Sequence, residues 1–161
     1  MDSPPKESLI FYLKLNQRVI DMQLDGITHA ESLMQPPFRG NCMNWVLGHI
    51  LTGRDSMLKE LGLPGELSPE QYRRYDRDSE PIVDPQQATE LEELRAMSKR
   101  SCQRLILAIE AMGMDTLNAE LTDHKNRSLG SVLAFSQWHE AYHAGQLEQL
   151  RQLSGKDDKV I

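Results

Sequence analysis

The stretch SLGSVLAFSQWHEAYHAGQLEQLRQLSG, residues 128–155, shows most clearly how this chain folds. Its apolar residues recur every three or four positions, which is the spacing of one face of an α-helix. We expect this helix to start near Ser128 and to stop at Gly155. The stripe consists of Leu129, Val132, Leu133, Ser136, His139, His143, Leu147, Leu150 and Leu153. Two histidines therefore lie in the middle of a stripe that otherwise predicts a core.

Three further segments have the same helical spacing. We predict helices from just after Ser3 to Met34, from residue 41 or 42 to residue 61, and from residue 86 to residue 112. Ser3 and Asn41 are candidate caps for the first two, and Gly62 is a candidate stop for the second. No segment alternates between apolar and polar residues as a strand would. The sequence therefore predicts an all-α, four-helix bundle formed by a single domain over residues 1–161.

The connection between the second and third helices is unusually long. Residues 63–85 are rich in Pro, Gly, Asp and Ser, and we expect an irregular crossover with a short turn of helix at about residues 71–75. A second connection covers residues 113–127. Connections as long as the crossover are often functional, so it is a candidate wall of a binding site.

Composition and charge narrow the class of protein. Apolar residues make up 39% and charged residues 26% of the 161 residues, which is the balance of a globular chain. The net charge is −6 with both signs interleaved, and the basic stripe of a nucleic-acid binder is missing. The sequence has no signal-peptide pattern and no apolar run of about 18 residues. We therefore expect a cytoplasmic protein with neither nucleic acid nor membrane as a partner.

The histidine pair indicates a metal site. His139 and His143 are four positions apart, so their rings lie one turn apart on one face of the helix. Burying two imidazoles is costly unless each finds a partner, and one metal ion can serve both. His49 is the best candidate for a third ligand because it lies in a strongly apolar mid-helix stretch, although it could instead pack on a neighbouring ring. His29 and His124 are expected to be exposed.

The residues around these histidines leave several alternatives open. HEAYH, residues 139–143, also fits the H-E-x-x-H pattern of zinc metalloproteases, in which the Glu is a general base. The longer form of that pattern fails, and Glu140 is expected to be solvated or paired with Arg151 or a neighbour. Cys42 lies two turns before His49 and could close the site as a fourth ligand. Gly48 and Gly53 could let a neighbouring helix or a ligand come close to the second helix.

Two motifs resemble one known family. NWVLGHI, residues 44–50, and HxxxHxGQL, residues 139–147, are similar to the DinB/YfiT-like superfamily. The resemblance implies a four-helix bundle, often a homodimer, with a metal site formed by His49, His139 and His143 that binds nickel, zinc or a similar ion. It also implies a relationship to S-transferases that use bacillithiol or mycothiol, and to a mycothiol-dependent maleylpyruvate isomerase.

These observations lead to competing hypotheses for the function. The favoured hypothesis is a metal-dependent enzyme whose open coordination position activates a low-molecular-weight thiol, of the bacillithiol, mycothiol or glutathione type, for transfer to a small-molecule substrate. Trp45, Trp138, Tyr142 and the crossover are expected to shape its pocket, and Gln146 to orient a ligand or fill a polar gap. The alternatives are a non-catalytic metal-binding or stress-response interaction module, a metal-dependent hydrolase, and a metal-free helical scaffold.

Overall fold

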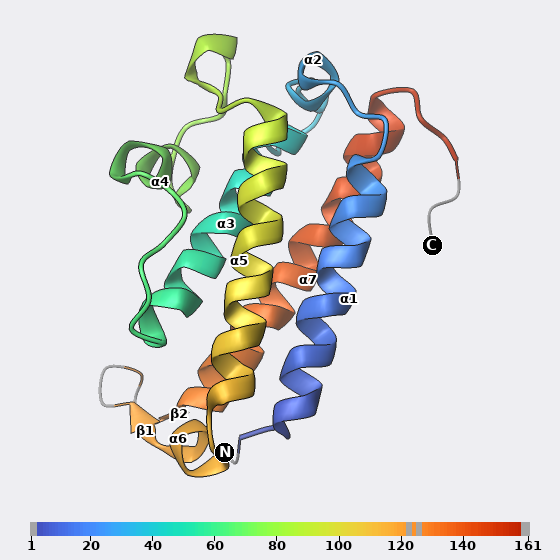
Figure 1. The fold of residues 1–161 in the computed structure, drawn as a ribbon. Helices are drawn as coiled ribbons and strands as arrows, with labels where there is room; N and C mark the ends of the chain where they lie inside the picture. Colours follow the sequence, from blue (N-terminus) through green and yellow to red (C-terminus); the bar gives the residue numbers. More distant parts are fainter. Residues whose placement is uncertain (1–2, 122–123, 125–126, 159–161) are drawn as a thin grey trace.

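Four long helices form the body of the protein (Figure 1). The computed structural model describes residues 3–121, 124 and 127–158. The long helices are α1 (Lys6–Leu24), α3 (Met43–Glu60), α5 (Leu91–Ala111) and α7 (Leu129–Leu153). Helices α1 and α3 each pack against both α5 and α7, so the four form a bundle. The prediction of an all-α bundle with a long crossover is confirmed.

Short elements connect the long helices. They are α2 (His29–Ser32), α4 (Pro69–Tyr75), the 3₁₀ turn η1 (Pro85–Gln87), α6 (Met114–Asn118), and the antiparallel pair β1 (Glu120–Leu121) and β2 (Arg127–Ser128). The turn of helix expected in the crossover is α4, which packs against α3. Helix α5 begins later than predicted, at Leu91, because η1 and an extended segment precede it. The crossover is thereby held against the bundle.

The first predicted helix is wrong in its length. It ends at Leu24 rather than Met34, because Asp25 is extended and Gly26 has a φ of +65°, a left-handed conformation that suits glycine. The chain then begins a separate helix, α2, where Thr28 and Glu31 form a capping box. Apolar spacing continued across this break, so the pattern alone could not reveal it.

Two of the predicted caps are also wrong. Ser3 does not cap α1; its hydroxyl donates to the carbonyl oxygen of Leu117 at 2.6 Å. Helix α3 begins after Cys42 rather than Asn41, with no side-chain cap. Ser128 does cap α7, by accepting a hydrogen bond from the backbone N–H of Ser131. Gly62 ends α3 with a φ of +71°, as expected.

A buried polar layer divides the apolar core into two clusters. We use this name for Gln17, Arg54, Ser98, Ser101 and Glu140, which come from all four long helices. One apolar cluster includes Leu47, Leu51 and Leu147, and the other includes Leu13, Met57 and Leu133. On every long helix the residue of the polar layer stands between residues of the two clusters.

Glu140 is the centre of this layer, which corrects the expectation that it is solvated or paired with Arg151. Its oxygens accept hydrogen bonds from Nε and Nη2 of Arg54 at 2.8 and 2.7 Å, and both side chains are buried. Arg151 instead pairs with Asp158. Burial lowers the pKa of Arg54, but the charge and hydrogen bonds of Glu140 raise it above its ordinary value. The guanidinium therefore stays charged inside the bundle.

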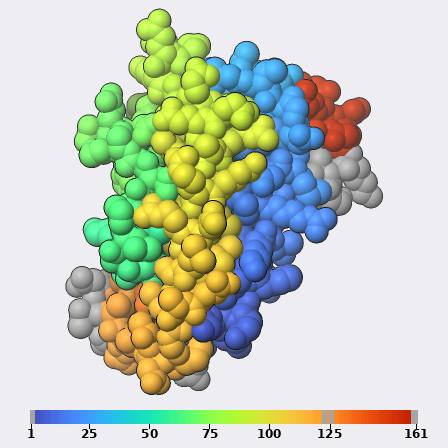
Figure 2. All heavy atoms as spheres, in the orientation of Figure 1, coloured from blue at the N-terminus to red at the C-terminus, as the bar shows by residue number. Residues whose placement is uncertain are grey.

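The faces of the molecule differ in how the bundle is covered. Figure 2 shows α5 across the front, with α1 along one side and the crossover along the other. On the side away from α5, helices α3 and α7 contact each other directly. None of the helices in the described part of the chain has both the length and the apolar character that crossing a membrane requires.

Candidate metal centre

His49 is held in place by the crossover. The ring of Tyr75, the last residue of α4, lies directly over Gly48, where any side chain would overlap it. Tyr75 is fully buried, and its hydroxyl donates to Oδ1 of Asn44 at 2.9 Å while accepting the backbone N–H of Thr89 at 2.8 Å. The close approach expected at Gly48 is therefore made by the crossover, whereas Gly53 has open space beside it.

The contact with Tyr75 fixes which nitrogen of His49 is free. Nδ1 of His49 donates to the carbonyl oxygen of Tyr75 at 2.9 Å. A neutral imidazole has one donor and one acceptor nitrogen, so Nε2 keeps the lone pair. The ring also stacks on Trp45, with ring centres 4.9 Å apart and planes 16° apart. His49 thus packs on a neighbouring ring and still offers a ligand nitrogen.

The two histidines of α7 have a similar arrangement. Nδ1 of His143 donates to Oε1 of Gln146 at 2.9 Å, one turn further along the helix, so its Nε2 also keeps a lone pair. Nε2 of His143 lies 3.1 Å from Nε2 of His139. Gln146 orients a histidine, which is one of the roles considered for it in the sequence.

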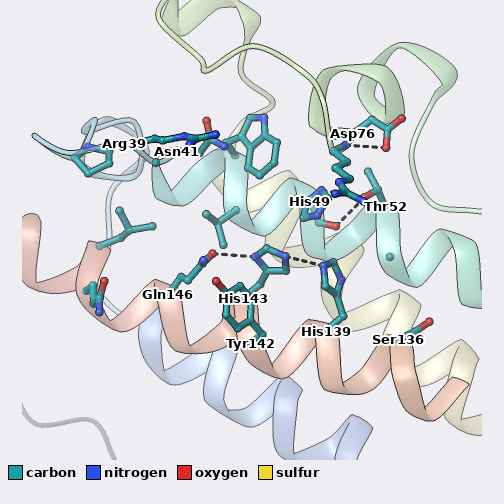
Figure 3. Close-up of a pocket in the computed structure, with 18 of the residues that line it drawn as sticks. Arg39, Asn41, His49, Thr52, Asp76, Ser136, His139, Tyr142, His143 and Gln146 are labelled. Atoms are coloured by element: carbon teal, nitrogen blue, oxygen red, sulfur yellow. Dashed lines mark hydrogen bonds between the residues drawn. The ribbon is translucent and has the colours of Figure 1, made fainter. Parts of the chain in front are cut away.

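The three imidazoles lie together, as the sequence predicts. One ligand atom from each lies within 4.8 Å of the other two, and the rings of His139 and His143 stand edge-on to that of His49. Figure 3 shows His49 on α3 facing His139 and His143 on α7, with Gln146 behind His143. Two separate helices, with His49 and His139 ninety positions apart in the sequence, thus supply one cluster.

The other candidate ligands lie elsewhere. His29 is half-buried rather than exposed, and its Nδ1 accepts the backbone N–H of Leu91 at the start of α5. His124 is also half-buried and contacts Glu60 at 2.9 Å. Among the residues that the structure describes, no cysteine or carboxylate joins the three histidines. Cys42 is buried, and burial raises the pKa of its thiol, which opposes the thiolate form that a metal requires.

The histidine cluster fits a divalent cation. Zinc–nitrogen bonds of about 2.1 Å place two ligand nitrogens about 3.0 Å apart at a right angle and about 3.4 Å apart in a tetrahedron. The observed separation of 3.1 Å between the Nε2 atoms of His139 and His143 falls within that range. The hydrogen bonds to Tyr75 and Gln146 also direct the protons of His49 and His143 away from the shared space. Such outer contacts are typical of histidines that bind metals.

The electrostatics favour the neutral form that a metal needs. Burial lowers the pKa of His143 to about 4, against an opposing effect of the hydrogen bond that its Nδ1 donates to Gln146. The pKa of His139 is also lowered, first by burial and then by the charges of His49 and Arg77. Both rings are therefore neutral at pH 7 and available as ligands.

A cavity of about 960 Å³ opens in front of the three histidines. Its walls come from α3, α7, the crossover and the segment between α2 and α3, and include Trp45 and Tyr142 as expected. Trp138, which was also expected there, is 61% exposed and does not line the cavity. The volume suits a small molecule. The histidine nitrogens thus have protein behind them and open space in front.

The family model of the DinB superfamily matches residues 12–147, which include all three histidines. This chain belongs to the DinB superfamily. A similar solved structure is that of a conserved protein from Enterococcus faecalis, with a TM-score of 0.72 and 15% identity over 96% of this chain and 98% of that one. At that identity the likeness shows a shared fold alone. No curated protein matches the chain significantly. The resemblance seen in the two histidine motifs is confirmed, and with it a DinB-like protein compatible with a metal ion.

Sequence reasoning missed two residues that matter to the site. The role of Tyr75 depends on its backbone carbonyl, which no sequence pattern reveals, although Gly48 signalled a close approach. Arg54 follows an apolar stretch on α3, and an arginine at that position could have indicated a buried carboxylate partner such as Glu140.

Proposed function

We propose that this DinB-superfamily protein holds one divalent cation with His49, His139 and His143 and activates a small thiol for transfer to a second small molecule. The main support is three converging imidazoles with a cavity on their free side. Catalytic sites typically combine three protein ligands with an open position, whereas structural zinc sites are filled by four. Zinc and nickel both suit imidazole ligands. The choice of a thiol of the bacillithiol, mycothiol or glutathione type rests on the resemblance to S-transferases.

When bound, a divalent cation favours the thiolate form of a thiol that contacts it, and the thiolate is the nucleophile. The protein's own residues prepare this site. Tyr75 and Gln146 fix the tautomers of His49 and His143, so that each presents a lone pair to the shared space. Trp45 and Tyr142 line the cavity and provide apolar surface for the carbon skeleton of a bound molecule.

The competing functions have less support. A metalloprotease of the H-E-x-x-H type needs its Glu beside the metal as a base, but Glu140 is buried and bonded to Arg54. A non-catalytic module would be expected to have a fourth protein ligand, and within the described residues none joins the cluster. A different hydrolase remains the second candidate, because the cavity admits water and Asp76 is among the residues that line it.

Metal binding and thiol reactivity test this proposal together. Chelator-treated protein should take up one Zn²⁺ or Ni²⁺ per chain. The loaded protein should accelerate the arylation of a small thiol by an activated aryl chloride at pH 7, with release of chloride. His139→Ala should lose both properties, whereas Cys42→Ala should keep both. One tightly bound ion per chain in His139→Ala would contradict the site, and a loaded protein that leaves every tested thiol unreactive would contradict the enzyme.

We also propose that two copies of the chain associate and that the protein acts in the cytoplasm. Large exposed apolar side chains gather on α1 and α7, two helices that pack on each other: Phe11, Tyr12, Leu15, Phe135, Trp138 and Tyr142. Helix α3, by contrast, is almost entirely buried. Sedimentation should give a dimer that Trp138→Glu weakens; a monomeric wild-type protein at micromolar concentration would contradict it.

A further inference from the structure

Two arginines line the cavity in front of the histidines. Arg39 comes from the segment between α2 and α3, and Arg77 follows α4 in the crossover. Among the residues that the structure describes, neither guanidinium has a carboxylate partner. Asp76 also lines the cavity, but its carboxylate accepts the backbone N–H of Arg77 at 2.8 Å.

Some arginines elsewhere in the chain are paired with carboxylates. Arg100 and Arg104 both pair with Glu66, and Arg151 pairs with Asp158. The whole chain has a net charge of −6, with 24 acidic and 18 basic residues. The cavity reverses this balance, because two arginines and a single aspartate line it. A surplus of positive charge in a cleft of an acidic protein attracts anions.

The same cavity also has apolar walls. Phe38, Trp45, Phe135 and Tyr142 all line it, and Trp45 is fixed by a hydrogen bond from its ring N–H to the hydroxyl of Ser79 at 2.9 Å. Aromatic walls with a few well-placed charged groups are typical of sites for small organic molecules. The lining therefore suits a molecule with both an apolar part and a negative charge.

We propose that the molecule bound in this cavity is a small organic anion whose carboxylate pairs with Arg77 while its carbon skeleton packs on the aromatic walls. This proposal rests on the proposed function only in assuming that the bound molecule reacts beside the histidines. Recognition of its carboxylate depends on the arginines of the cavity and needs no metal ion. Arginine suits this role because its guanidinium bonds a carboxylate through two parallel N–H donors.

Arg77 lies two residues after Tyr75, whose carbonyl oxygen accepts the Nδ1–H of His49, and it lines the cavity beside the histidines. Its charge contributes to the lowered pKa of His139, after burial and the charge of His49. Figure 3 shows Arg39 toward one end of the cavity and Asp76, the neighbour of Arg77 in the chain, toward the other, with His143 between them. A carboxylate on Arg77 therefore leaves the rest of a small molecule beside the imidazoles, and Arg39 should contribute less.

Two pairs of probes test the proposal. Benzoate and benzyl alcohol differ in charge at similar size, and their binding to metal-free protein can be measured by calorimetry or by side-chain NMR of the histidines. 3-Mercaptopropionate and 3-mercaptopropanol form the same comparison for thiols, followed by the thiolate absorption of Co²⁺-loaded protein. In each pair the carboxylate should bind about tenfold more tightly, which corresponds to one charge-assisted interaction.

Arg77→Gln should remove this preference while leaving the affinity for the neutral probe unchanged, and Arg77→Lys should restore part of it. Arg39→Gln should reduce the preference less. Arg73→Gln is the matched control, since Arg73 is exposed on α4, does not line the cavity, and carries the same charge. Equal binding of both members of the benzoate pair, no binding of either, or a preference that survives in Arg77→Gln would overturn the proposal. If the benzoate pair shows the preference and neither thiol binds to the Co²⁺-loaded protein, the result would count against the proposed function instead.

Discussion

The polar layer and the histidine cluster are two polar regions on the same two helices, and they differ in where their hydrogen bonds go. Arg54 lies five residues after His49 on α3, and Glu140 directly follows His139 on α7. In the polar layer, the Arg54 guanidinium donates to Glu140, Gln17 and Ser98 within the bundle. In the histidine cluster, Nδ1 of His49 and Nδ1 of His143 are bonded to protein, while the rings face a cavity.

This difference separates a structural role from a functional one. Buried polar groups that satisfy one another stabilise a particular packing, and they leave nothing for an outside ligand. Lone pairs that face an open cavity stay available to a ligand from outside. The polar layer and the histidine cluster occupy neighbouring positions on the same helices. The polar layer therefore fixes α3 against α7 close to the point where the histidines meet. These two roles can be tested by substituting residues in one region and measuring the stability or the metal affinity that depends on the other.

The largest expected effect is the loss of Glu140. In Glu140→Leu the Arg54 charge would be buried without its partner, so the free energy of unfolding should fall by about 3–5 kcal/mol in urea denaturation of metal-free protein. The double variant Arg54→Met with Glu140→Leu should regain most of this loss, because no unpaired charge remains.

The double variant also tests whether the two regions are independent. Because the polar layer fixes α3 against α7 beside the histidines, the metal affinity of this variant should fall by more than about threefold. An affinity within about threefold of wild type would mean that apolar packing alone aligns the two helices. Arg100→Ala is the control, since this arginine is 55% exposed and its pair with Glu66 should be worth less than about 1 kcal/mol. A loss in Glu140→Leu no larger than that in Arg100→Ala would contradict the structural role of the polar layer.

A smaller effect is expected from Gln146, which touches the histidine cluster from behind. Gln146→Leu removes the acceptor for Nδ1 of His143 and should weaken metal binding about tenfold, as measured by competition with a coloured chelator. Gln149→Leu is the matched control, because Gln149 lines the same cavity on the same helix without contacting a histidine. Equal affinities of the two variants would mean that Gln146 does not orient His143.

A further expected effect is a pH dependence of stability. The pKa of His143 is lowered from 6.5 to about 4. Between these values the unfolded chain binds a proton that the folded protein does not, so the free energy of unfolding should be highest above pH 6.5 and fall as the pH drops toward 4. His143→Gln should flatten this slope in metal-free protein. An unchanged slope in the variant, measured by urea denaturation at several pH values, would contradict the burial of a neutral imidazole.

The sequence by itself determined the four long helices, the crossover between the second and third, and the two histidines on one face of α7. These features follow from the 3.6-residue period and from helix stops such as Gly62, which act over a few neighbouring residues. The motif around His49 also pointed to the third ligand and to the superfamily.

Only the tertiary structure decided which polar side chains face each other. Glu140 pairs with Arg54, 86 residues away, and the tautomer of His49 depends on a carbonyl of the crossover. Helical spacing places Glu140 only one position from His139, yet one side chain enters the core and the other faces the cavity. The direction of a residue at the edge of a helical stripe depends on the neighbouring helices, because the free energy of burying a charge is set by the partner that another segment supplies.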